Sequence, residues 1–247
     1  MQTKSVRRWI RVLHYWLGVI VSLQLLIWLI TGVYFNLTPH DELKGMVYNH
    51  SHHIEPKALK IDPERLLSAE EVLALSPNNT VEQLTLQMIA GQPVYMLDNQ
   101  VQRYQHQCQQ QSLRHAYSGK PFVIDRHIAT QLALNSYMGP GEFISINKLE
   151  KAHTEWPKQC NPMWQVNMAD ELETRIYINA VNGQLIGHKN QQTQVADFMF
   201  KLHFMDYLHQ GSFNNPFSWL FGLMMLILSL TGLYWVIENL IMKRYRV

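Results

Sequence analysis

One histidine, His14, stands where a long run of apolar residues begins. If the run is helical, steps of four and three place further residues within about 80° of it on one face. These are Gly18, Ser22, Leu25, Leu29 and Gly32. Ionisable residues inside membrane helices are costly and usually face the bundle interior. A neutral imidazole there can bind haem iron, with the glycines leaving room for a flat porphyrin. The alternative is an interfacial histidine that touches lipid headgroups.

A second apolar run, near the other end of the chain, carries a similar stripe of mostly small residues. Its members are Ser218, Gly222, Met225, Ser229 and Gly232. Small residues on one face mark where membrane helices approach one another closely. The stripes are therefore either packing seams between helices or, together with His14, the walls of a cofactor site.

Three further histidines flank the apolar runs on the side away from His14. His203 and His209 precede the second run, and His40 follows the first. His203 and His209 are six residues apart, about 240° around a helix, so they do not share a face. They could serve different roles or bind a haem from different subunits, and the alternative is a pair of ordinary surface histidines. His40 follows Pro39 and ranks lower, because it could simply end a helix.

A separate histidine cluster lies between the apolar runs. His50, His52 and His53 occur within four residues, and His50 and His52 would share the face of a strand. Imidazoles bind iron, copper, nickel or zinc well. The spacing is not specific, so a solvated loop is the alternative to a metal site.

The apolar runs themselves predict two membrane-spanning helices, at residues 15–35 and 217–237. Neither contains a charged residue, and about 20 apolar residues span a bilayer. A cleaved signal peptide is the alternative for the first run, but the run is too long and has no A-x-A-like site. Lys and Arg crowd the outer flanks of both runs, at Lys4, Arg7, Arg8, Arg11, Lys243, Arg244 and Arg246. This pattern predicts that residues 1–14 and 238–247 are cytoplasmic and that the chain is a bacterial inner-membrane protein with a periplasmic middle.

The middle of the chain reads as a tandem repeat, at residues 58–123 and 124–190. Lys60-Ile61-Asp62 opens the first copy and Val123-Ile124-Asp125 the second. Each copy is expected to begin with a helix, at residues 63–75 and 126–137, and to continue as antiparallel strands. The strands are expected at residues 81–89, 93–97, 100–104, 163–168 and 174–179.

Turns and connections complete this prediction. Hairpin turns are expected at Asp98-Asn99 and Asn182-Gly183. A linker should occupy residues 36–57, and residues 191–216 should hold a helix at 196–209 followed by a second linker. The fold class is thus a membrane protein with an α+β periplasmic domain. Cys108 and Cys160 both fall in that domain, and whether they form a disulfide is left open.

Several of these segments resemble the PepSY-associated transmembrane family. Residues 11–18 (RVLHYWLG) with Thr31-Gly32 look like its first helix, and residues 208–211 (LHQG) with Gly222 and Thr231-Gly232 look like its second. Residues 164–183 resemble the strand pair of a PepSY repeat. The resemblance covers nearly the whole chain. Larger relatives have four spans, so this chain looks like a half-sized version.

The resemblance implies a haem protein that reduces ferric iron, free or bound to a siderophore, using an electron donor that the sequence does not identify. A b-type haem with two histidine ligands is expected. One His14 cannot supply both ligands, so a homodimer would bring the second across a two-fold axis. The alternatives are a regulatory or binding module without catalysis, as in soluble PepSY domains, and an accessory protein that handles periplasmic metal.

Composition and motifs exclude other classes. The formal charge of +2 is too small for a nucleic-acid-binding domain. The sequence has no Ser-His-Asp signature, no H-E-x-x-H and no nucleotide-binding glycine loop.

Overall fold

The computed structural model describes residues 2–49, 61–76, 80–208 and 211–241. The chain divides into two compact units. The helical unit combines both ends of the chain, Met1–Thr38 and Ala196–Val247, and the outer unit comprises Pro39–Val195.

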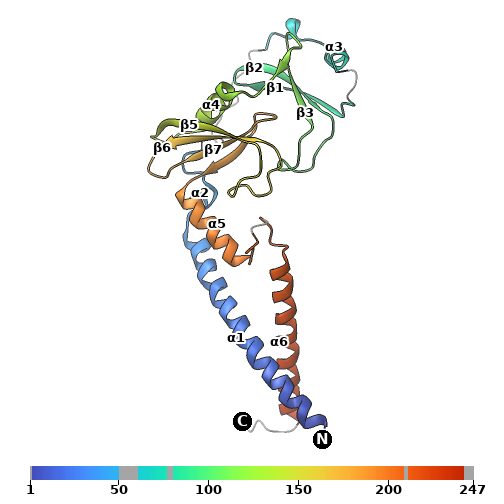
Figure 1. The fold of residues 1–247 in the computed structure, drawn as a ribbon, viewed down its shortest axis with the longest axis vertical. Coiled ribbons are helices and arrows are strands. Elements are labelled where there is room, and N and C mark those ends of the chain that lie inside the picture. Colours follow the sequence, from blue (N-terminus) through green and yellow to red (C-terminus); the bar gives the residue numbers. More distant parts are fainter. Residues whose placement is uncertain (1, 50–60, 77–79, 209–210, 242–247) are drawn as a thin grey trace. The chain divides into compact units, whose positions relative to one another are not determined.

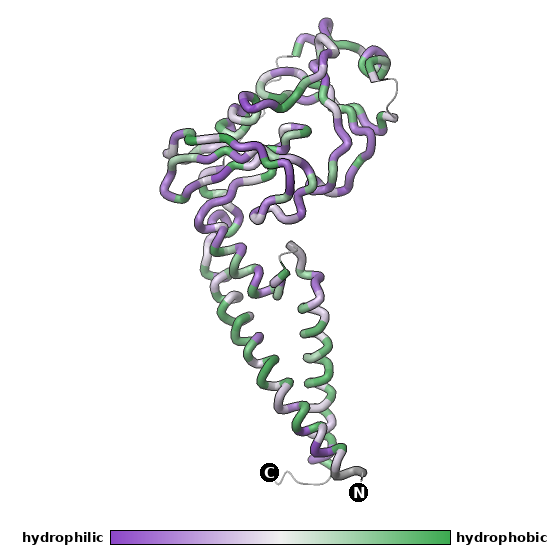
Figure 2. The backbone as a smooth tube through the Cα atoms, in the orientation of Figure 1, coloured by the Kyte–Doolittle hydropathy of each residue, from purple (hydrophilic) through white to green (hydrophobic). Residues whose placement is uncertain are grey.

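Two long helices form most of the helical unit and pack side by side (Figure 1). They are α1 (Gln2–Leu37) and α6 (Pro216–Ile241). Segments Ser5–Leu37 and Pro216–Ile241 are long and apolar enough to cross a membrane, and Figure 2 shows hydrophobic residues along most of both. The buried Asn215 starts α6, because its Oδ1 accepts hydrogen bonds from the backbone N–H groups of Phe217 and Ser218, and Pro216 takes the first helical position, where no N–H is needed.

The seam between α1 and α6 is lined by large side chains. Buried Val21 and Phe221 pack with Trp28 and Leu228. These positions lie one residue before Ser22, Gly222, Leu29 and Ser229 of the predicted stripes, all four of which are exposed. In the middle of the helices, the predicted stripes therefore do not form the contact between α1 and α6. Larger apolar side chains bury more surface at the seam, and the small residues are left on outer faces.

A third helix, α5 (Gln191–His203), precedes α6. It begins five residues earlier than predicted, because Asn190 and Thr193 cap it reciprocally through side-chain bonds to each other's backbone N–H. It also ends six residues earlier, at His203, and the chain turns at Met205, whose φ is 53°. The prediction of a helix through residue 209 is wrong for this reason.

The described residues in the first half of the outer unit form three short helical segments and one sheet. The helices are α2 (His40–Lys44), the 3-10 helix η1 (Pro63–Arg65) and α3 (Ala69–Ala74). The strands are β1 (Gln83–Ile89), β2 (Gln92–Asp98), β3 (Gln111–His115) and β4 (Pro121–Phe122). They form an antiparallel sheet in the order β1-β2-β3-β4.

The second half repeats this plan with α4 (Arg126–Asn135) before its sheet. The strands are β5 (Glu142–Leu149), β6 (Met163–Ala169), β7 (Arg175–Asn179) and β8 (Leu185–Lys189). They form a second antiparallel sheet in the order β5-β6-β7-β8. Both sheets contribute to one hydrophobic core, in which Val94 and Leu113 of the first join Val166 and Ile176 of the second.

Several predicted elements of the outer unit match and others do not. The helix at 126–137 and the strands at 81–89, 93–97, 163–168 and 174–179 are confirmed within a few residues. Residues 182–183 form the β7–β8 turn, where Gly183 has φ 75°. The predicted strand at 100–104 is wrong, because this stretch is a loop and the third strand lies at β3.

Two local causes explain the remaining differences. The predicted hairpin turn at Asp98-Asn99 is wrong, because Asp98 is still paired at the end of β2 and a loop at residues 99–110 leads to β3. The β1–β2 hairpin turns at Ala90-Gly91, where both residues have positive φ, as a type I′ turn requires. The predicted helix at 63–75 is broken, because Leu66 is extended and Ser68 starts α3 with a capping box.

The two cysteines of the outer unit, Cys108 and Cys160, are joined in a disulfide with a Cα–Cα distance of 4.9 Å.

Candidate functional site

His14 on α1 is held by a threonine on α6. Its Nδ1 lies 2.8 Å from Oγ1 of Thr231. The Thr231 hydroxyl donates its own proton to the backbone carbonyls of Ile227 and Leu228, each at 2.9 Å. Its oxygen must therefore accept from the imidazole, so we assign the proton of neutral His14 to Nδ1. This leaves the lone pair of Nε2 available to a metal.

The space around the His14 ring depends on a glycine. A Cβ atom built on Gly232 would lie 3.2 Å from Cε1 of His14, tighter than most real contacts. The ring of Trp235 lies 5.5 Å from the imidazole, centroid to centroid. His14 is half-buried. The glycine in Thr231-Gly232 thus gives the imidazole its room, and the threonine gives it an orientation.

His203, at the end of α5, has the same arrangement with the other helix. Its Nδ1 lies 2.8 Å from Oγ1 of Thr31. Thr31 is buried and donates its hydroxyl proton to the carbonyls of Ile27 and Trp28, at 2.8 and 3.2 Å. The same reasoning places the proton of His203 on Nδ1 and the lone pair on Nε2.

Neighbouring side chains fix the end of α5 beside α1. The indole Nε1 of Trp28 donates to the carbonyl oxygen of His203 at 2.6 Å, and Gln24 Nε2 donates to that of Leu202 at 3.3 Å. The Phe35 ring stacks on Phe200 at 4.3 Å. Together these contacts hold His203 at a defined height on α1.

The two histidine–threonine pairs lie at opposite ends of the helix pair. Thr31 follows His14 by 17 residues on α1, which corresponds to about 25 Å along the axis. This distance is close to the thickness of a bilayer's hydrocarbon core. Among its described residues, the helical unit thus presents one oriented imidazole near each face of such a layer.

Sequence reasoning identified both histidines but missed Thr31 and Thr231 as their partners. The available signal was the Thr-Gly dipeptide, which occurs once in each apolar run. A threonine in a membrane helix normally satisfies its hydroxyl on its own backbone, so the sequence does not reveal that each oxygen also accepts from a histidine of another helix.

Of the other predicted site residues, Gly232 lies against the His14 ring. Among the described residues, no hydrogen bond or ring contact joins His40, Gly18 or Gly32 to either histidine. His40 is exposed and begins α2 in the outer unit. Gly18 makes an ordinary contact with Leu228, with 3.9 Å from a built Cβ, and the space beside Gly32 is open.

His209 and the predicted metal ligands His50, His52 and His53 lie outside the described residues. Within the described part of the chain, no group of three His, Cys, Asp or Glu side chains is placed to hold a metal ion.

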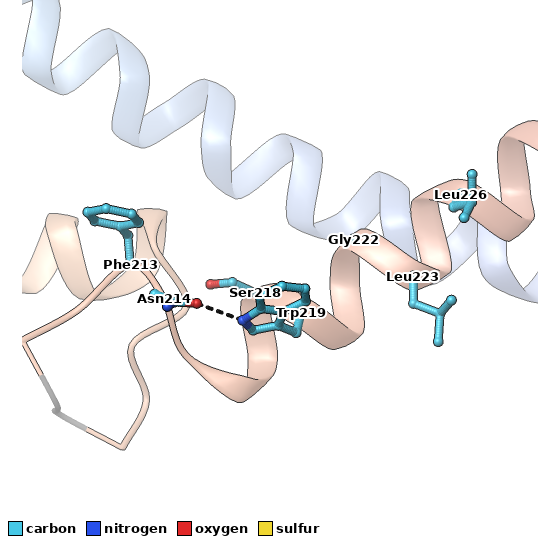
Figure 3. A pocket seen from close by; sticks show the side chains of 7 residues that line it. All are labelled: Phe213, Asn214, Ser218, Trp219, Gly222, Leu223 and Leu226. Carbon is cyan, nitrogen blue, oxygen red and sulfur yellow. Dashed lines mark hydrogen bonds between the residues drawn. The ribbon is translucent and has the colours of Figure 1, made fainter.

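A groove of about 470 Å³ lies on the outer face of α6 beside Gly222. Figure 3 shows Ser218, Trp219 and Leu223 around it, with Phe213 from the preceding loop. Trp219 is held by a hydrogen bond from its Nε1 to Asn214 Oδ1, at 2.7 Å. Ser218 and Gly222 belong to the predicted small-residue stripe, so the stripe borders open space.

These residues fit a haem ligand set only in part. Each histidine offers one Nε2, whereas a six-coordinate haem with two histidine ligands needs two at the same height. Val21 and Phe221 fill the seam between α1 and α6, so a porphyrin has no room there. A haem would have to lie on an outer face of the helix pair and take its second ligand from elsewhere.

Comparison with known proteins identifies one family. The model of the PepSY-associated TM region matches residues 11–244. No significant match was found among curated proteins or among solved structures. Because the match spans nearly the whole chain and includes both long apolar helices, this membrane protein belongs to the PepSY-associated transmembrane family.

Proposed function

We propose that this protein transfers electrons through haem across the bacterial inner membrane and reduces ferric iron, free or siderophore-bound, in the periplasm. The observation that carries the proposal is the pair of oriented imidazoles, His14 with Thr231 and His203 with Thr31. Haem iron would supply the one-electron chemistry when bound.

The threonines favour a ligand role over simple helix packing. Hydrogen bonds between helices also stabilise membrane proteins, so a His–Thr pair has a structural reading. However, metal-bound histidines are typically oriented by a hydrogen bond from the second ring nitrogen. Both pairs use Nδ1 for this bond and leave Nε2, and Gly232 keeps the space around the His14 ring open. A hydrogen bond that only packed two helices would not need to use the same ring nitrogen at both His14 and His203.

A homodimer would complete the ligand set. One chain offers a single oriented histidine at each height among its described residues. A second copy related by a two-fold axis offers the matching imidazole, and His209 is a further candidate on the His203 side. Gly222 and Ser229 lie exposed on α6, and small residues allow membrane helices of two copies to approach closely.

Charge and cysteine chemistry support the proposed location of each end. Arg7, Arg8 and Arg11 precede the apolar part of α1, which favours a cytoplasmic position for His14. The Cys108–Cys160 disulfide in the outer unit suits an oxidising compartment. Electrons from a membrane or cytoplasmic donor would enter near His14 and leave near His203, where ferric iron is the acceptor.

Transmembrane electron transfer is testable in vesicles that contain the full chain and trapped dithionite. External ferric citrate is the acceptor, and ferrozine reports the ferrous product. Vesicles with the wild-type protein should reduce external iron faster than protein-free vesicles, and His14→Ala and His203→Ala should abolish the excess. His40→Ala is the matched control, because His40 is exposed and lies in the outer unit, and it should retain the activity.

A second pair of variants tests whether the orientation of the His14 ring matters in addition to the presence of the histidine. Thr231→Ser keeps a hydroxyl acceptor for His14 and should retain activity, whereas Thr231→Val removes it and should not. Wild-type vesicles that reduce no more iron than empty ones would contradict electron transfer and would favour a non-enzymatic regulatory or metal-handling role.

A further inference from the structure

A polar pocket of about 200 Å³ lies in the outer unit, where the first sheet meets the β7–β8 turn of the second. Its walls are rich in carboxamide groups and contain one acidic and one basic side chain. The residues that matter here are Asp98, Arg103, Gln109, Gln111, Asn182 and Gln184.

The loop that forms one wall is firmly anchored. Its start is held by a hydrogen bond from the Val101 N–H to Glu82 Oε2, at 3.0 Å. Its end is held by the Cys108–Cys160 disulfide and by Asn161, whose Oδ1 accepts from the N–H of Gln109 at 2.6 Å. A wall fixed in this way loses little conformational entropy when a ligand binds.

Asp98 is the buried charge of the pocket, with only 5% of its surface exposed. Its Oδ1 accepts from Gln111 Nε2, and Gln111 Oε1 in turn accepts from Asn182 Nδ2 at 3.0 Å. Its Oδ2 accepts no hydrogen bond from any residue in the described ranges. This oxygen is not among the buried side-chain atoms without a partner in the described residues, so it is open to water or to a ligand in the pocket. Asp98 therefore presents an unused acceptor at the pocket.

Arg103 supplies the opposite charge from the anchored loop. Its guanidinium lies over the Tyr104 ring, 5.4 Å from the centroid, which holds it beside the pocket. A lone anion would be repelled by Asp98 and a lone cation by Arg103. A divalent metal would find a single carboxylate, which is too few oxygen ligands of the right charge. Because Arg103 is exposed and Asp98 is buried, a ligand that carries both signs could pair with both side chains from inside the pocket.

We infer that this pocket binds a small zwitterion of the size of a free amino acid. The ligand's ammonium group bonds to Asp98 Oδ2, its carboxylate pairs with Arg103, and its side chain meets the carboxamides of Gln109 and Gln184. The volume of about 200 Å³ is below that of pockets for drug-sized ligands. This binding site is independent of haem and would act as a sensor or carrier of its ligand.

The test uses the full-length protein in mild detergent and equilibrium dialysis against an equimolar mixture of the twenty standard amino acids. Mass spectrometry of the protein compartment should show enrichment of at least one of them. Asp98→Asn and Arg103→Gln should each reduce the enrichment at least tenfold. Arg126→Gln, at an exposed arginine of α4 outside the pocket, is the matched control and should bind as the wild type does.

A second measurement on the wild type avoids any folding defect of the variants. The N-acetyl derivative of the enriched amino acid lacks the ammonium group, and its carboxamide lacks the carboxylate, so both should bind at least tenfold more weakly. No enrichment, or enrichment that survives both variants and both derivatives, would overturn the proposal. The haem spectrum of the same samples is not expected to change.

Discussion

Lowering the pH should destabilise the outer unit through one buried histidine on β8, His188. Only 2% of its surface is exposed. Its Nε2 donates to Oγ of Ser136 at 2.9 Å, since that hydroxyl gives its own proton to Ala133 O. Nδ1 has no hydrogen-bond partner among the described residues. Burial lowers the pKa of His188 from 6.5 to about 4, although the charge of Asp170 opposes this.

The sign and size of the effect follow from proton linkage. The folded protein favours the neutral form of His188, so between pH 6.5 and 4 the unfolded chain binds more protons at this residue than the folded chain does. The stability from this group is fully present above pH 6.5 and is lost as the pH falls toward 4. The whole difference corresponds to about 3 kcal/mol, and about 2 kcal/mol of it should be lost by pH 5.

The assay is urea denaturation of the full chain in mild detergent, followed by tryptophan fluorescence at pH 7.5 and pH 5. His188→Gln keeps an N–H donor for Ser136 but does not titrate. The wild type should lose about 2 kcal/mol more than this variant between the two pH values. Equal losses in the two proteins would refute the reasoning, because the drop would then come from other groups.

Three further predictions follow from single contacts. Replacing both cysteines by serine should lower the unfolding free energy of the outer unit by about 2–4 kcal/mol, measured by the same denaturation, and an unchanged midpoint would show that the disulfide is not formed in the native protein. Glu155→Gln should cost about 2 kcal/mol, because Arg175, 2.7 Å from Glu155 Oε1, keeps an acceptor but loses its charged partner in a partly buried site, and a loss below about 0.5 kcal/mol would contradict this. Gly232→Val should displace the His14 ring, since even a Cβ there lies 3.2 Å from it, and should reduce haem content, while His40→Ala, at an exposed residue of the outer unit, leaves haem unchanged.

The membrane helices were predictable because their signal is local. An uncharged run of 21 residues at 15–35 specifies a span without reference to the rest of the chain. It was harder to predict which face of each long helix packs against the other helix. Small residues such as Gly222 indicate close approach of helices, but they do not say which helix approaches. In the helical unit, α6 packs against α1 through Phe221, one position before Gly222.

In the outer unit, strands with strong alternation and β-branched residues were found, such as β7. The missed strand β3 is mostly polar, with Leu113 as its only apolar residue, and its place is fixed by pairing with β2 through register Met96↔Leu113. Such pairing is tertiary and overrides weak local preference. The strand predicted at 100–104 is absent because this stretch belongs to the loop between β2 and β3. The end of that loop is held by the Cys108–Cys160 disulfide and by Asn161 instead of by strand pairing.

The candidate site was predictable by residue type but not by geometry. His14 stood out because an ionisable residue in an apolar run is costly. The bonds from His14 to Thr231 and from His203 to Thr31 span 217 and 172 residues of sequence. Contacts of this separation leave no periodic trace in a single sequence, so the orientation of each imidazole became visible only in the folded chain.

The central claim is that His14 and His203 are haem ligands, and the reduced-minus-oxidised absorbance spectrum of the purified full chain tests it most directly. Protein from haem-replete cells should show a Soret band and sharp α and β bands of low-spin haem b. His14→Ala and His203→Ala should each remove part of that spectrum, and the double variant should remove all of it, while His40→Ala leaves it intact. A colourless wild-type protein, or a double variant with the wild-type spectrum, would contradict the account.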